Sequence, residues 1–421
     1  MSNNKINWGS IFKITDIFKY LKGNDLKEFA YTSKSIYISF KPQIFGTLNV
    51  SNKRKDFIEN IPLMVFFGED KRLIKLKSMN TVYISFRLPA PRFRLLFGCF
   101  KNITHLSLVS VKFEVLFINQ ILRKLTKLRS LELKVLKIVA EFAFLLKGGN
   151  ASLFIPLHLN QLMLKSCVSR VNVEIITDYF AARDLKYNAF VNFPNFKYEK
   201  LKHLSIIDNN QHKVPFINRY LVNNPWLKKL SIDYYELDGE SFSLLANFKG
   251  LTHLVLLKCD QKLNFSTEHH RPIISIKTLS LDETIYSLNF KSVLSFVSYL
   301  PNLQYLKLIY NCPNGTSIEK LIFKLSSLTS LTLISKKPSQ YSLNLVNNTL
   351  YSIILVNFKY NPRLVTDRLK DLIGLRKLKL TNATLDNPRD VIKLDKVGVK
   401  FKKLGWNAIS NGNSINCSKI I

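Results

Sequence analysis

The sequence predicts an α/β solenoid, in which short parallel strands stack into a concave sheet and helices return along the convex side. Two observations carry this prediction. One pattern recurs thirteen times after residue 78: an apolar residue, two variable residues, an apolar residue, one variable residue and a last apolar residue. Between the copies, segments such as 113–122 and 293–300 carry apolar residues at helical spacing. The 421 residues, 47% of them hydrophobic, suffice for a large core and exclude disorder for most of the length.

The period of the pattern indicates the class of repeat. Apart from one step of 42 residues, successive copies start 22 to 31 residues apart, with a mean of about 25, which is the period of leucine-rich repeats. The last two apolar residues of each copy lie two positions apart, so in a strand both side chains point into the core. The thirteen copies are Met79-Val82-Ile84, Ile103-Leu106-Leu108, Leu128-Leu131-Leu133, Leu159-Leu162-Leu164, Leu201-Leu204-Ile206, Leu227-Leu230-Ile232, Leu251-Leu254-Leu256, Ile276-Leu279-Leu281, Leu303-Leu306-Leu308, Leu328-Leu331-Leu333, Leu350-Ile353-Leu355, Leu375-Leu378-Leu380 and Phe401-Leu404-Trp406.

The long step lies between Leu159 and Leu201 and contains an insertion at about 169–199. Long insertions in repeat arrays are often functional. The insertion is either a degenerate repeat or a loop that projects from the array, and both interpretations stay open.

The N-terminal segment does not follow the repeat. Apolar residues from Ile11 to Leu21 recur at helical spacing, Gly23-Asn24-Asp25 interrupts them, and Leu26 begins a second apolar face. One interpretation is a helical cap, because the exposed apolar end of a solenoid has to be covered.

The order of residues in this segment resembles an F-box. Ile17-Phe18-x-Tyr20-Leu21 is followed by Asp25-Leu26, by Ser33-Lys34, and by Pro42-x-Ile44-Phe45-x-x-Leu48-x-Val50. With the repeats behind it, the chain is similar to the F-box/leucine-rich-repeat proteins. It departs from that family at Gly9-Ser10, where the family has Leu-Pro, and at Ile36, where it has Trp.

The resemblance implies a substrate-recognition subunit of an SCF-type ubiquitin ligase, which carries no catalytic residue of its own. The box would dock on the Skp adaptor and through it on cullin, while the repeats bind a protein substrate and hold it near the ubiquitin-charged enzyme. A protein-interaction scaffold that recruits no ligase is the first alternative, and the missing Leu-Pro favours it. The expected adaptor-binding residues are Ile11, Phe12, Ile14, Ile17, Phe18, Tyr20, Leu21, Leu26 and Pro42.

The expected domains are a three-helix F-box-like unit at 1–50, a helical linker at 51–78, the repeat domain at 79–406 and a frayed polar tail at 407–421. On the repeat strands, the positions expected to face solvent are rich in hydroxyl and aliphatic residues and no more basic than the chain average, which suits a protein partner. Residues 358–403 are about three times as basic per residue as the long middle of the chain, so we expect an acidic or phosphorylated partner there. The expected substrate-binding residues are Tyr305, Lys307, Ile309, Ile354, Lys377, Lys379, Lys400, Lys402 and Lys403.

The net charge of +33 raises a further alternative, a nucleic-acid-associated protein. Lys supplies 47 of the 62 cations and Arg only 15, although Arg is the usual reader of phosphates and bases. A coding bias toward Lys, Asn, Ile and Phe explains the same excess without a partner. We therefore do not expect a nucleic-acid partner.

The remaining motifs predict no cofactor, metal or catalytic site. The five cysteines form no C-x-x-C pair, and no phosphate-binding glycine loop occurs. His105, His203 and His253 share one repeat position but lie on separate strands, so they cannot converge on one ion. The apolar runs are too short for a membrane span and the start lacks a secretory signal. We expect a protein that is monomeric outside its complex, in the cytoplasm or nucleus.

Overall fold

The computed structural model describes residues 47–50, 81–84, 97, 102–135, 137–141, 153–165, 168–172, 197–207, 216–233, 237, 239–257, 271–286, 290–311, 316–340, 349–360, 372–381, 384–385, 401–403, 405–411 and 414–420, and the structural statements below concern these residues. The chain forms two compact units. Unit 1 comprises Met1–Asn195 and Asn209–Gln211, and unit 2 comprises Phe196–Asp208 and His212–Ile421.

Unit 1 contains a parallel sheet built from the first repeats. Its strands, in spatial order, are β1 (Thr47–Val50), β2 (Thr81–Ile84), β3 (His105–Val109), β5 (Ser130–Lys134) and β7 (Gln161–Lys165). The register places Leu106 opposite Leu131, and Leu131 opposite Leu162, so equivalent leucines of successive repeats stack in the core. The four predicted strands at 81–165 are confirmed. The sheet also begins earlier than residue 79, because Thr47–Val50 pairs with β2.

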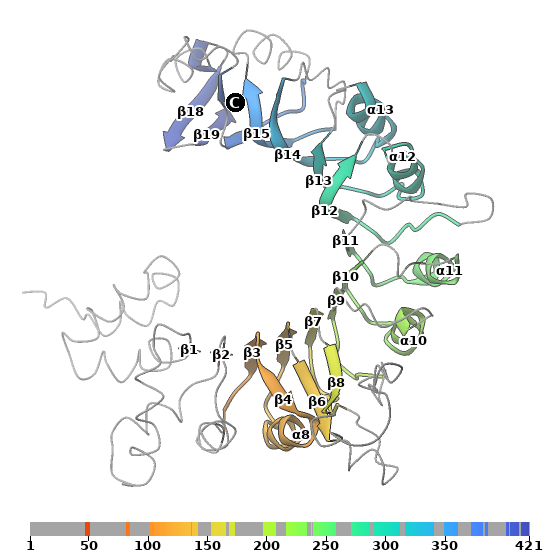
Figure 1. The fold of residues 1–421 in the computed structure, drawn as a ribbon. Coiled ribbons are helices and arrows are strands. Elements are labelled where there is room, and N and C mark those ends of the chain that lie inside the picture. Colours follow the sequence, from red (N-terminus) through yellow and green to blue (C-terminus); the bar gives the residue numbers. More distant parts are fainter. Residues whose placement is uncertain are drawn as a thin grey trace, which may run out of the picture. The chain divides into compact units, whose positions relative to one another are not determined.

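The other side of unit 1 carries a second parallel sheet beside a helix (Figure 1). Strands β4 (Lys112–Glu114), β6 (Lys137–Glu141) and β8 (Val168–Asn172) pair in that order, and α8 (Val115–Lys124) follows β4. The expected helix at 113–122 is confirmed by α8, but strands lie beside it where only helices were expected, because β-branched residues in β6 and β8 favour extended backbone. The first residues of the predicted insertion form β8, and 173–196 lie outside the described residues.

Unit 2 continues the repeat with eight parallel strands. They are β9 (His203–Ile207), β10 (Lys229–Asp233), β11 (His253–Leu257), β12 (Thr278–Tyr286), β13 (Tyr305–Asn311), β14 (Ser330–Gln340), β15 (Ser352–Tyr360) and β16 (Lys377–Thr381), with the short β17 (Thr384–Leu385) beside β15. Helices α10 (Phe216–Asn223), α11 (Gly239–Asn247), α12 (Phe290–Ser298) and α13 (Thr316–Lys324) lie on one side of this sheet (Figure 1). The predicted helical side is confirmed for unit 2.

Stacked leucines and one buried amide hold unit 2 together. Leu230 lies in register with Leu204 and Leu254, and all three are at most 1% exposed. Fully buried Asn224, after α10, accepts a hydrogen bond from the Tyr198 backbone N–H at 3.0 Å and donates one to the Tyr220 carbonyl at 2.8 Å. The amide thus satisfies backbone groups that the repeat removes from water.

An antiparallel hairpin closes the sheet of unit 2. β18 (Trp406–Asn411) pairs with β19 (Ser414–Lys419), and β19 runs antiparallel to β16. Two expectations are therefore wrong: Phe401-Leu404-Trp406 is not a thirteenth parallel repeat, and 407–421 is not a frayed tail. Ile415 and Cys417 are buried while Asn416 and Ser418 between and beyond them are exposed, which is the alternation of a strand with one face on the core.

Candidate protein-interaction surface

The face of the unit 2 sheet opposite helices α10–α13, called the open face below, carries three rows of side chains across β13 to β16. Each row follows the strand register, so its members are neighbours across the sheet. The first row is Tyr305, Ser330, Ser352 and Lys377. The second is Lys307, Thr332, Ile354 and Lys379, and the third is Ile309, Ile334, Val356 and Thr381.

These rows bring together most of the residues that the sequence marked for substrate binding. Lys307, Ile354 and Lys379 share the second row, and Tyr305 and Lys377 are the ends of the first. The structure does not place Lys402 and Lys403 in the rows: they are exposed in a helical turn at 401–403 before the hairpin. Lys400 lies outside the described residues, as do all the expected adaptor-binding residues and the linker at 51–78.

The hairpin extends the open face beyond β16. Asn416 on β19 lies opposite Lys379, and Ile409 on β18 lies opposite Asn416. The Ile409 side chain is 61% exposed, although it is aliphatic. The sequence predicts a frayed end after residue 406 and therefore does not predict this extension.

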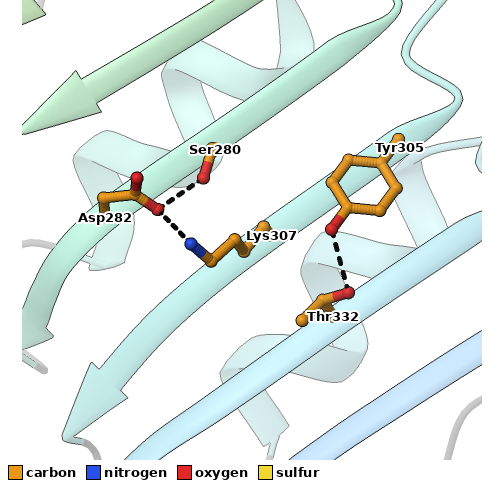
Figure 2. Close-up of polar contacts among 5 residues, drawn as sticks. All are labelled: Ser280, Asp282, Tyr305, Lys307 and Thr332. Atoms are coloured by element: carbon orange, nitrogen blue, oxygen red, sulfur yellow. Dashed lines mark hydrogen bonds and ion pairs between the residues drawn. The ribbon is translucent and has the colours of Figure 1, made fainter. Parts of the chain in front are cut away.

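One of the lysines on the open face is already neutralised. Lys307 Nζ donates a hydrogen bond to Asp282 Oδ1 at 2.5 Å, and Ser280 Oγ donates to the same oxygen at 2.6 Å (Figure 2). Asp282 lies on β12 and Lys307 on β13, so the ion pair joins neighbouring strands. Lys307 is therefore a weaker anchor for an acidic partner than the sequence suggested.

Two small hydroxyl residues are buried rather than solvent-facing: Thr332 of the second row, and Ser280 of β12, which lies opposite Lys307 of that row. Thr332 is 6% and Ser280 7% exposed, and the Tyr305 hydroxyl lies 3.1 Å from Thr332 Oγ1, within hydrogen-bonding distance (Figure 2). The expectation that all these positions face solvent is wrong because adjacent strands lie only ~4.8 Å apart. Longer neighbours such as Tyr305 and Lys307 cover the short side chains between them.

Two lysines at the β16 end of the rows remain positioned for an anion. Lys377 Nζ lies 5.5 Å from the centre of the Tyr351 ring, a cation–π distance, and its side chain is exposed. Lys379 is exposed beside it and makes no ion pair in the described part of the chain. Among the side chains that the structure describes, Lys377 and Lys379 therefore supply the positive charge of the open face near the hairpin.

Unit 1 repeats the motif of a serine, a carboxylate and a lysine. Glu132 Oε2 accepts a hydrogen bond from Ser107 Oγ at 2.5 Å, and Glu132 Oε1 lies 2.6 Å from Lys134 Nζ. Here too a lysine of the sheet surface is neutralised within its own unit. Such partly exposed pairs contribute little to stability, about 0–1 kcal/mol, but they remove charge from the surface.

No group of three or more His, Cys, Asp or Glu side chains is arranged to hold a metal ion within the described ranges. Among the same residues, no helix has both the length and the apolar composition required to cross a membrane.

Comparison with known proteins assigns no family. No protein-family model matches the chain, and no curated protein matches it. The solved structures that resemble it include the yeast Rad7–Elc1 complex, with 15% identity over 93% of this chain and 97% of that chain and a TM-score of 0.40.

Two bacterial structures also resemble the chain. The internalin InlF of Listeria monocytogenes shares 15% identity over 81% of this chain and 93% of that chain, with a TM-score of 0.32. The leucine-rich repeat-containing protein LegL7 of Legionella pneumophila shares 14% identity over 80% of this chain and 95% of that chain, with a TM-score of 0.31. Such low scores carry no functional argument, so the fold rests on the strand register and the leucine repeat of the chain itself.

Proposed function

We propose that this chain is a non-catalytic receptor that binds a protein partner on the open face of unit 2. The observation that carries the proposal is the surface made by the third row with Lys377 and Lys379. Half-buried Ile309, Ile334 and Val356 form an aliphatic strip across adjacent strands, and the lysines stand at its β16 end. Apolar area for burial beside an orienting charge is the composition of a protein-binding patch.

We further propose that the receptor serves an SCF-type ubiquitin ligase and that the bound protein is its substrate. The F-box-like order of residues at 1–50 supports this, with the Skp adaptor and cullin as partners and an acidic or phosphorylated protein as substrate. The repeats would then tether the substrate, which raises its concentration near the ubiquitin-charged enzyme.

A pull-down with the Skp adaptor tests ligase recruitment. The intact chain should retain the adaptor, and an Ile17→Asp/Phe18→Asp variant should lose it because charges replace two apolar contacts. Absence of binding by the intact chain, or equal binding by the variant, would leave a scaffold without a ligase.

A pull-down that compares the proteins retained by the wild type and by variants of the open face tests whether this face binds the partner. Proteins retained by the wild type should be lost by Val356→Asp, which places a charge in the aliphatic strip, and by Lys379→Glu, which reverses one of the two charges at its β16 end. Ile373→Asp is the matched control, because Ile373 is 71% exposed and precedes the strand outside the rows. Thermal melting of each variant confirms folding. The same set of proteins on all three variants would refute binding at this face.

A further inference from the structure

Three ionisable side chains lie side by side on the first strands of unit 2. The register places Lys229 of β10 opposite His203 of β9 and opposite His253 of β11. Because neighbouring strands are ~4.8 Å apart, both histidines flank the lysine closely. All three side chains are exposed on the open face, so the row His203–Lys229–His253 is accessible to a ligand.

Three further lysines adjoin the group His203–Lys229–His253. Lys202, Lys228 and Lys277 each precede a strand by one residue and are exposed. Backbone bonds fix their alignment: the N–H groups of Lys228 and Lys229 both donate to the Lys202 carbonyl, at 2.8 and 2.9 Å. The Lys277 N–H donates to the carbonyl of Thr252, whose own N–H donates to the Lys228 carbonyl, both at 3.0 Å. The six side chains therefore form one basic patch across β9 to β12.

Among the described residues of unit 2, few carboxylates lie near this patch. Asp233 lies four residues beyond Lys229 on the same strand, about 13 Å away in an extended chain, and it is 1% exposed. Asp282 lies four residues beyond Thr278 on β12 and already binds Lys307. Glu199 is exposed three residues before Lys202, and Asp208, which directly follows β9 in the sequence, lies outside the described residues.

The protonation of His203 and His253 depends on the charged groups that lie next to them. Partial burial and the neighbouring cation Lys229 lower the pKa of His203 and of His253 below the ordinary value. The positive charges of His253 and Lys202 also lower the pKa of His203. The His253 Nδ1 atom lies 2.8 Å from Thr252 Oγ1, which leaves its Nε2 for an outside ligand.

We propose that this basic patch binds a segment rich in Asp and Glu on the protein partner, and that protonation of His203 and His253 strengthens that binding. The proposal rests on the proposed function, since it assigns the partner's acidic segment to a defined part of the open face. The cations are spread over four strands, about 14 Å, which matches several carboxylates in sequence better than a single phosphate. An approaching carboxylate favours the charged imidazolium, so binding takes up protons.

Titration of the full-length chain with a short fluorescent oligoglutamate peptide tests the proposal, with oligoglutamine as the uncharged reference. Glutamate side chains stay ionised between about pH 7.5 and about pH 5.5, so a change in affinity over this range reports the protein. The wild type should bind about three- to tenfold more tightly at the lower pH, as two exposed charge pairs form. His203→Gln/His253→Gln should bind without this pH response, and Lys229→Glu should bind weakly at both pH values.

His105→Gln is the matched control, since His105 occupies the same repeat position in unit 1 between Thr81 and Ser130. It should keep the wild-type pH response. An unchanged response in the double histidine variant, or no binding of oligoglutamate by the wild type, would overturn the proposal. Tighter binding of a single-stranded RNA of equal charge, lost in the same variants, would assign the patch to nucleic acid and also overturn it.

The outcome is separable from that of the proposed function. If Lys379→Glu abolishes partner capture while oligoglutamate binding shows no dependence on His203 and His253, the receptor function stands and this inference fails. If the pH response is found but capture is equal on all open-face variants, the patch binds acidic peptides and the receptor function at the rows fails.

Discussion

Lys307 Nζ on β13 lies 2.5 Å from Asp282 Oδ1 on β12, and the two side chains are 29% and 31% exposed. Asp282 neutralises the charge of Lys307. On the open face of unit 2, two regions, one on either side of this pair, keep their positive charge. These are the basic patch on β9 to β12 and the lysines Lys377 and Lys379 on β16.

Asp282→Asn should free Lys307. We expect a loss of unfolding free energy of about 0–1 kcal/mol, because partly exposed ion pairs contribute little. The affinity of oligoglutamate for the open face should rise, since one more cation is available. Urea unfolding and peptide titration measure the two effects. Glu132→Gln, which frees Lys134 in unit 1, is the control for charge alone, and equal gains in both variants would contradict a local effect.

Asn224→Ala should destabilise unit 2 strongly. The change leaves the Tyr198 N–H and the Tyr220 carbonyl without the buried amide, at a cost of about 2–4 kcal/mol in unfolding free energy. The neighbouring Asn223 also donates to the carbonyl four residues back, Arg219, but is not buried. Asn223→Ala should therefore change stability by less than about 0.5 kcal/mol. Similar losses in both variants would show that burial is not the cause.

Val135→Asn should stabilise unit 1. Val135 has φ of 52°, in the left-handed region where a β-branched residue is strained, and its side chain is 48% exposed. Asn tolerates this backbone, so we expect a gain of about 0.5–1 kcal/mol in unfolding free energy. Val222→Asn, at an exposed position of α10, should give no gain. Stabilisation of both variants in urea unfolding would attribute the effect to removal of exposed valine.

Cys417 should resist alkylation in the folded protein. The thiol is buried in β19, and burial raises its pKa to about 12, so almost no thiolate exists at neutral pH. Peptide mapping after iodoacetamide treatment should find Cys417 unmodified in the native chain and fully modified in urea. Rapid modification of the native chain would mean that the hairpin opens. Trp406→Ala removes a buried side chain of β18 and should promote this opening.

The stability of unit 2 should fall in mild acid. The fold lowers the pKa of His203 and His253, so the unfolded chain takes up their protons first. Their contribution to stability is complete above about pH 6.5, the ordinary histidine value, and is lost as the pH falls through the lowered values. Urea midpoints measured from about pH 7.5 to about pH 5 should decline less in His203→Gln/His253→Gln than in His105→Gln. Parallel curves would contradict the shift.

The strand positions of both units could be predicted because the leucine pattern is nearly regular. Each buried pair, such as Leu230 and Ile232, has to meet its counterpart in the next repeat, so the period alone determines the register. The same register brings Lys307, Ile354 and Lys379, three of the expected substrate-binding residues, into one row.

The ion pair between Asp282 and Lys307 could not be predicted by aligning equivalent positions of successive repeats. The β12–β13 register shifts between Leu281 and Thr284, which moves Asp282 relative to the next strand. The burial of Ser280 and Thr332 depends likewise on the lengths of neighbouring side chains, which a single repeat does not contain.

The hairpin could have been found from the sequence. Gly412-Asn413 lies between two segments of alternating polarity, and such pairs favour two-residue hairpin turns. The leucine pattern concealed this signal, because Phe401-Leu404-Trp406 matches it in spacing while Trp406 begins an antiparallel strand.

Pairing of β19 against β16 also restricts how this chain can change in length. A repeat duplicated within β9 to β16 adds one more strand of the same direction and leaves every neighbour with a compatible partner. If a repeat were inserted between β16 and the hairpin, its strand would have to pair antiparallel with β19. It would then need residues that replace Leu378 and Leu380 in that pairing. We therefore expect gain or loss of repeats to be tolerated inside the array and not at the junction of β16 with β19.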